Sequence, residues 1–148
     1  MKNYALILLL AAATVISSCS KDDDDNTGGG GGGGGTTATN TSKLCNKNWK
    51  LVSFKLNGID VTSQFFQPCD LDDFSRFLVD STYTADEGPT KCDPADPQTS
   101  TGTWGWAASE TKLIIDGDTS NVITNSGTSL KLGVTDPTLG TIELTFGL

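Results

Sequence analysis

Apolar and polar residues alternate along the C-terminal part of the chain. In residues 130–135 and again in residues 141–146, every second side chain is apolar, and its neighbours are polar or glycine. A period of two gives a segment one apolar face and one polar, solvent-exposed face, which is typical of antiparallel strands that cover a core. Asp136, Pro137 and Gly140 lie between the two segments and predict a turn.

The strand pattern extends back to residue 49, because no stretch after Leu44 shows the 3.6-residue stripe of an amphipathic helix. Eight short strands joined mostly by tight turns favour an all-β fold, a small antiparallel up-and-down barrel, since closure removes the exposed edges of an open sheet. A β-sandwich is the alternative. The predicted strands are residues 49–56, 74–79, 82–85, 101–106, 113–115, 121–125, 130–135 and 141–146.

Two longer connections interrupt this meander. Residues 57–73 open on an Asn-Gly turn and contain Phe65 and Phe66, whereas residues 86–100 contain three prolines. In a barrel both connections could flank a mouth, and loops held on a rigid sheet are where binding residues commonly lie. Plain surface loops, with the two phenylalanines plugging one end of the barrel, are the alternative.

The N-terminus has the pattern of a bacterial lipoprotein signal. Lys2 is followed by an uncharged run over residues 4–16, which is too short for a transmembrane helix but suits the apolar region of a signal peptide. The Ile-Ser-Ser-Cys sequence that ends at Cys19 resembles a lipobox, whose cysteine is diacylated after cleavage. We therefore expect a signal peptide at residues 1–18 and membrane anchorage through lipid on Cys19. An ordinary signal peptide with an unmodified cysteine is the alternative.

Behind Cys19 the chain is polar and rich in glycine. A lysine and four carboxylates are followed by eight consecutive glycines, so we predict a disordered tether over residues 19–43 and one domain over residues 44–148. A lysine and acidic residues just behind a lipidated cysteine resemble the surface-export signal of Bacteroidota lipoproteins, which implies a cell-surface location on the outer membrane. A solubilising spacer is the alternative. The export residues are Lys21, Asp22, Asp23, Asp24 and Asp25.

Three cysteines remain for the predicted domain. Cys69 and Cys92 lie in the two long connections, and an extracytoplasmic location favours their oxidation. We predict a disulfide between them, which stabilises the fold by about 3 kcal/mol on the chain-entropy model. Cys45 is then expected to be a reduced, buried thiol. A zinc site is disfavoured because the chain has no histidine and its cysteine spacings are wide.

Acidic residues shape the expected chemistry. Removal of the signal peptide takes away one lysine and no acid, so the mature chain would carry 9 basic against 18 acidic side chains. This charge and the lack of a basic stripe disfavour nucleic-acid binding. Eight acids lie between Asp70 and Asp96, where a solvated rim is favoured over a calcium site because no EF-hand pattern is present. No catalytic site, metal or cofactor is expected, since nucleophiles such as Ser109 and Cys45 have no histidine base.

The order of several motifs resembles the lipocalin-like domain of Bacteroidota lipoproteins. These are a Trp-Lys-Leu-Val-Ser first strand from Trp49, an Asn-Gly turn, Cys69 ahead of two aspartates, and Gly-Thr-Trp ending at Trp104. The resemblance covers residues 44–148. It implies a barrel and ligand binding without naming a ligand.

Two functions are consistent with these features. The first is a monomeric, lipid-anchored, non-catalytic binding module for a small apolar molecule or a glycan, with aromatic side chains as contacts. The alternative is a structural or protein-interaction domain with a solid core, in which the same aromatic residues only pack. The candidate contacts are Trp49, Phe65, Phe66, Trp104 and Trp106.

Overall fold

A computed structural model describes residues 39–148 of the chain. The expected signal peptide, the lipidation site Cys19, the export residues 21–25 and the tether as far as residue 38 lie outside the described residues. Within residues 39–148, no helix is long and apolar enough to cross a bilayer. The helices are α1 (Asn40–Leu44), α2 (Thr62–Phe65) and α3 (Pro68–Leu71). The strands are β1 (Asn48–Leu56), β2 (Ile59–Asp60), β3 (Phe74–Phe77), β4 (Thr82–Asp86), β5 (Thr99–Ala107), β6 (Lys112–Ile115), β7 (Asp118–Asn125), β8 (Ser129–Asp136) and β9 (Gly140–Gly147).

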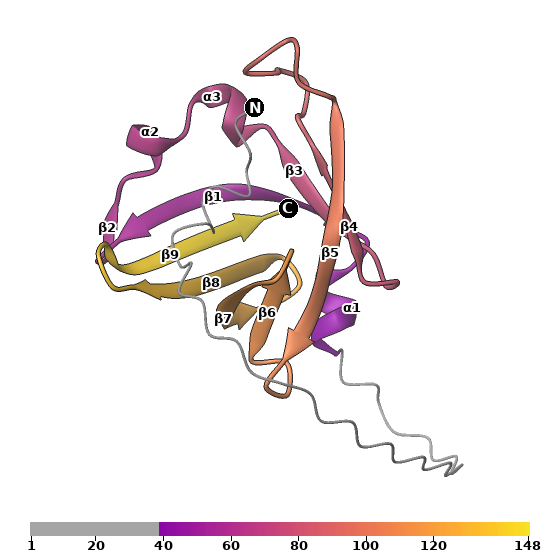
Figure 1. The fold of residues 1–148 in the computed structure, drawn as a ribbon, viewed down its shortest axis with the longest axis vertical. Coiled ribbons are helices and arrows are strands. Elements are labelled where there is room, and N and C mark those ends of the chain that lie inside the picture. Colours follow the sequence, from indigo (N-terminus) through magenta and orange to yellow (C-terminus); the bar gives the residue numbers. More distant parts are fainter. Residues whose placement is uncertain (1–38) are drawn as a thin grey trace.

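The strands form a closed antiparallel barrel (Figure 1). From β3 onward each strand pairs with the next along the chain, and β1 pairs with both β3 and β9, so eight strands close the ring. The predicted up-and-down barrel is confirmed over the sandwich alternative. The ninth strand, β2, pairs only with β1. It was not predicted because two residues are too short to show a period.

The alternation seen in the sequence decides which side chains point inward. Register pairs Leu130 with Phe146 and Leu132 with Leu144, so the apolar members of β8 and β9 share one face. Leu130 and Leu132 are buried at 1% and 3% exposure. The strand β5 is shared between two parts of the barrel, because residues 99–103 pair with β4 and residues 104–107 pair with β6.

The β1–β3 contact is the short seam of the barrel. Only Asn48 and Trp49 of β1 pair with β3, whereas β8 and β9 pair along their whole lengths. Beyond the seam, the backbone of Phe54 in β1 forms hydrogen bonds with the segment that follows β2. Its backbone N–H donates to Thr62 Oγ1 at 2.8 Å, and its carbonyl accepts from the Val61 N–H at 2.9 Å. These bonds satisfy backbone groups that a neighbouring strand would otherwise pair.

Helix α1 covers one end of the barrel. Leu44 is fully buried there, and Thr39 caps the helix by accepting the Ser42 N–H on its hydroxyl at 3.1 Å. Asn125 Nδ2 donates to the Asn40 carbonyl at 3.0 Å. A helix this short has little stability of its own, so these tertiary contacts hold it. Residues 40–43, which were expected to belong to the tether, therefore form part of α1.

Candidate functional site

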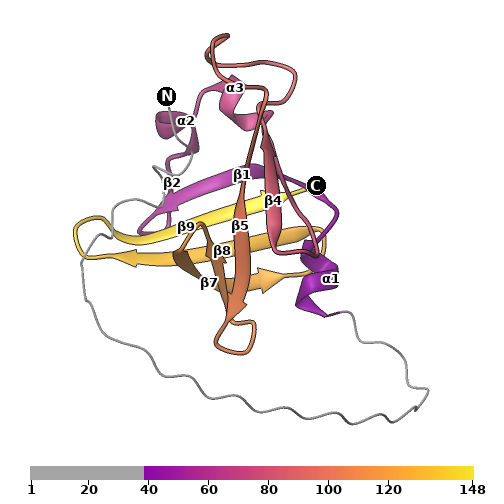
Figure 2. The same ribbon diagram turned by 45° about the vertical axis from the view of Figure 1, so that its right-hand side comes forward.

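The two long connections lie together at the end of the barrel opposite α1. Residues 57–73 hold β2, α2 and α3, and residues 87–98 join β4 to β5. Figure 2 shows α2, α3 and this loop at one end and α1 at the other. We call the first the loop end and the second the α1 end. The loop end is the candidate functional site, because both connections present side chains from a rigid sheet there.

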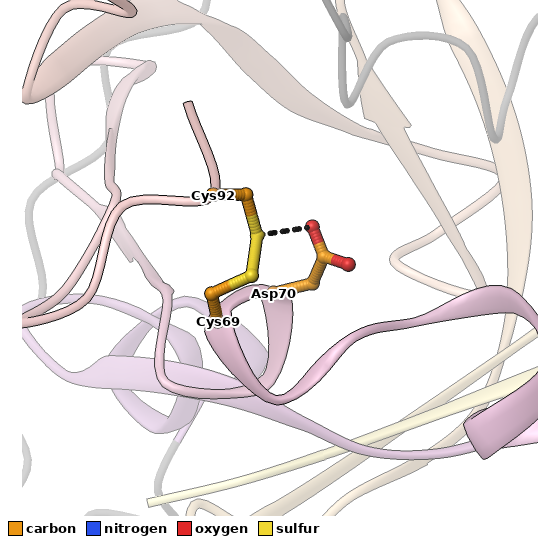
Figure 3. Close-up of side chains that lie close together, drawn as sticks. All are labelled: Cys69, Asp70 and Cys92. Atoms are coloured by element: carbon orange, nitrogen blue, oxygen red, sulfur yellow. Dashed lines mark hydrogen bonds between the residues drawn. A yellow bond between two sulfur atoms is a disulfide. The ribbon is translucent and has the colours of Figure 1, made fainter. Parts of the chain in front are cut away.

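A disulfide joins the two connections. Cys69, in α3, is bonded to Cys92, which lies in the loop of residues 87–98 and is 23 residues away along the chain (Figure 3). The predicted disulfide is thus confirmed. Cys45 is a free, buried cysteine, also as predicted. The cross-link restricts the motion of the two connections relative to each other, so the loop end has a defined surface.

Asp70 lies directly against this disulfide. Its Oδ1 is 3.2 Å from Cys92 Sγ (Figure 3). The oxidised sulfur carries no hydrogen, so we describe this approach as a close contact between carboxylate and sulfur. Cys69, Asp70 and Cys92 also have the spacing of a metal-binding group. Metals bind cysteine as the thiolate, and these two sulfurs are bonded to each other. The group is therefore not a metal site in the oxidised protein.

Other carboxylates lie in or beside the two cross-linked connections. Asp86 Oδ1 accepts from the Gly88 N–H at 2.9 Å and from Gln98 Nε2 at 2.8 Å, which ties the two ends of the loop together. Asp72 packs tightly against Gly88, where an added Cβ would lie 2.7 Å from its Oδ1. That oxygen is buried without a hydrogen-bond partner. The acids expected to form a rim do gather at the loop end, although Asp80 lies at the α1 end, in the turn between β3 and β4.

The neighbouring carboxylates affect the ionisation of Glu87. Burial raises the pKa of its carboxyl group, and Asp96 raises it further, while Lys91 acts in the opposite direction. Lys91 Nζ donates to the carbonyl of Asp96, so the one lysine of this loop is held inside it. The loop end therefore carries a strong negative potential.

The tryptophans expected as ligand contacts are built into the core. Trp49 is 1% exposed and Trp104 is 7% exposed. The Trp49 indole N–H donates to the carbonyl of Leu44, and that of Trp104 donates to the carbonyl of Leu78, both at 2.8 Å. The half-buried Trp106 donates to Thr41 Oγ1 at 2.9 Å and so holds α1. All three indole donors are used within the protein.

Phe65 and Phe66 have different surroundings, although they are adjacent. Phe66 is 8% exposed and its ring lies 5.6 Å from that of Phe54, whereas Phe65 is 59% exposed and lies 5.2 Å from the same ring. Phe66 therefore closes the core at the loop end. Phe65 rests on that core and presents most of its ring to solvent.

A polar pair that the sequence did not suggest lies in the barrel wall. Tyr83 donates its hydroxyl hydrogen to Asp116 Oδ2 at 2.6 Å, and the Thr103 N–H donates to Asp116 Oδ1 at 2.8 Å. Burial and the neighbouring Asp116 raise the pKa of Tyr83. The sequence could not suggest this pair, because nothing local shows that Tyr83 lies across from Asp116, 33 residues away.

The environment of Cys45 does not favour nucleophilic chemistry. Burial raises the pKa of its thiol, and the nearby Asp80 raises it further. The thiolate is the reactive form, and the chain has no histidine to act as a base. We assign no catalytic role to this residue.

The sequence matches no protein-family model and no curated protein. The function is therefore argued from the geometry of the loop end and from the sequence.

Proposed function

We propose that this chain is a lipid-anchored protein of the bacterial cell envelope that displays its barrel as a non-catalytic binding module. The observation that carries the proposal is the arrangement of the loop end. Two connections are cross-linked by Cys69 and Cys92, they present the exposed Phe65, and they lie opposite the end where the tether enters. A binding surface in this position lies at the opposite end of the domain from the chain that leads to the proposed anchor.

Among the two ligand classes considered, the geometry favours a glycan at the loop end over an apolar molecule inside the barrel. The interior is packed with Trp49, Trp104 and Phe66. Phe65 offers an exposed aromatic face on which a sugar ring can stack, and it lies shortly before the acidic segment that begins at Asp70. Carboxylates accept hydrogen bonds from sugar hydroxyls.

Glycan binding is tested with the mature chain and a panel of immobilised neutral oligosaccharides. We expect Phe65→Ala to weaken binding by about tenfold, the scale of a lost aromatic contact. Ile123→Ala is the matched control, because Ile123 is 51% exposed on β7, away from the loop end. Equal binding by both variants would reject the role of Phe65.

The alternative is a structural or protein-interaction domain without a small-molecule ligand. The filled aromatic interior and the three satisfied indole donors favour it. Failure of the folded mature chain to bind any oligosaccharide of the panel would support this alternative.

Membrane anchorage is a separate part of the proposal and has its own test. Cys19→Ser should abolish labelling with radioactive palmitate and release the protein from the membrane fraction. Replacement of Lys21 and of residues 22–25 by alanine should leave the labelling intact and remove the protein from the cell surface, as judged by protease treatment of whole cells. Undiminished labelling of Cys19→Ser would exclude lipidation at this residue.

A further inference from the structure

The α1 end differs from the rest of the domain in charge. It is formed by α1, the β3–β4, β5–β6 and β7–β8 turns and the C-terminus. Residues 39–148 contain eight basic and 14 acidic side chains. Five of the basic side chains lie in these elements or within three residues of this end in the adjoining segments, together with only two of the acidic ones, Asp80 and Glu110. The five are Lys43, Lys47, Lys50, Arg76 and Lys112.

Contacts between elements place these cations at one end. Lys47 Nζ donates to the Gly127 carbonyl at 2.6 Å, and a Cβ added to Gly127 would lie 3.7 Å from the side chain of Lys43. Lys50 pairs with Gly147 at the end of β9, and Lys112 begins β6. The positive charge therefore spreads over the whole end.

Two apolar side chains are exposed at the same end. Val79, in the turn after β3, is 72% exposed, and Leu148 at the C-terminus is 62% exposed. The Asn46 N–H donates to the Phe77 carbonyl at 2.8 Å, which places the Val79 turn beside the end of α1. Exposed apolar side chains among lysines are a combination that suits the headgroup region of a bilayer.

We propose that the α1 end is a membrane-docking surface, which holds the barrel on the phosphate-bearing headgroups of the bilayer that contains its own lipid anchor. This inference rests on the proposed anchorage at Cys19. The sequence predicts a Gly-rich tether of about twenty residues between Cys19 and Thr39, and a coil of that length, with a reach of about 25 Å, would not by itself set the orientation of the domain. The charge of the domain sets its orientation, because the lysines of the α1 end are attracted to anionic lipid and the acidic loop end is repelled. Docking then directs Phe65 away from the membrane.

The test uses the lipidated mature chain in vesicles of phosphatidylethanolamine and phosphatidylglycerol, with vesicles of phosphatidylcholine as the neutral comparison. Lysines are labelled with a water-soluble amine reagent and read by mass spectrometry. We expect labelling of Lys43, Lys50 and Lys112 to fall by about fivefold in anionic vesicles, the effect of one favourable lysine contact with an anionic surface. Lys55 and Lys131 should be unchanged. High salt should restore the labelling, because it screens the attraction.

Two variants examine the apolar contact without disturbing the core. Val79→Glu should restore labelling of the three lysines, whereas the matched control Ile59→Glu should not. Ile59 is 68% exposed and lies in β2 at the loop end.

Three outcomes would overturn the docking proposal. One is uniform labelling of all lysines in a protein that sediments with the vesicles, which leaves anchorage intact. Another is protection that persists in neutral vesicles, which would assign the lysines to the acidic run of residues 22–25. The third is an equal effect of Val79→Glu and Ile59→Glu. If the protein does not sediment with vesicles at all, the anchorage itself is wrong, and the docking proposal fails with it.

Discussion

Gly102 illustrates how single residues shape the barrel wall. It lies on β5, and a side chain there would collide with Asp116 Oδ1 and with the Tyr83 ring. The lack of a Cβ therefore lets Tyr83 and Asp116 approach each other and form their hydrogen bond. Gly105, on the same strand, has open space where a Cβ would lie, with no atom within 4 Å. The two glycines thus have different roles in one strand.

Gly102→Ala should separate Tyr83 from Asp116 and destabilise the fold by about 0.5–1.5 kcal/mol, the net contribution of a typical hydrogen bond. It should also return the Tyr83 pKa toward its ordinary value of 10.0. Absorbance titration of the mature chain reads this residue alone, because Tyr4 belongs to the predicted signal peptide. Gly105→Ala is the control and should change neither quantity.

The same pair makes stability depend on pH. Because the Tyr83 pKa is raised in the folded state, its contribution to stability is complete below the unfolded value and is lost as the pH rises above it. The wild-type domain should therefore lose stability above pH 10 more steeply than Gly102→Ala. Equal slopes would show that Asp116 does not act on the tyrosine.

At the scale of elements, the disulfide joins two connections that repel each other. Asp70 belongs to α3, and Glu87 and Asp96 belong to the loop of residues 87–98. Both Asp96 and Asp70 raise the pKa of Glu87, so negative charges face each other across the cross-link. The covalent bond holds α3 and the loop together against this repulsion.

Removal of the cross-link by Cys69→Ala with Cys92→Ala should lower the free energy of unfolding by about 3 kcal/mol. Part of this loss should be recovered in about 1 M salt, where the Debye length is about 3 Å and the carboxylates no longer repel. Urea denaturation at low and high salt measures both effects, and the reduced wild-type protein serves as the control. A loss that does not depend on salt would argue against repulsion between the connections.

At the scale of the whole molecule, neighbouring strands of the barrel are not paired over equal lengths. β1 meets β3 through two residue pairs, but it meets β9 along most of its length. Local opening begins where few backbone hydrogen bonds must break. The ring is therefore weakest between β1 and β3.

Hydrogen exchange should detect this seam. We expect the amides of β3 and β4 to exchange faster than those of β8 and β9, because opening at the seam exposes β3 and β4 first. Mass spectrometry of the mature chain after exchange in heavy water gives both rates. Uniform protection around the ring would mean that the barrel opens only by global unfolding.

The sequence by itself determined the strands, their apolar faces and the disulfide. Alternation over residues 130–135 and 141–146 is a local property of the chain, and a strand has two faces wherever it lies. Cys69 and Cys92 could be paired because they occupy the only two long connections of the predicted strand meander, whose remaining turns are short.

Only the tertiary structure decided the roles of residues that look alike in the sequence. Phe65 and Phe66 are adjacent and both rings lie against that of Phe54, yet Phe65 at the end of α2 is exposed and Phe66 just after it is buried and closes the core. The structure likewise decided that Asn40 belongs to the domain and that five of the eight basic side chains of residues 39–148 lie at the α1 end. These features depend on contacts between residues far apart in the chain, and a local pattern of apolar and polar positions carries no information about such contacts.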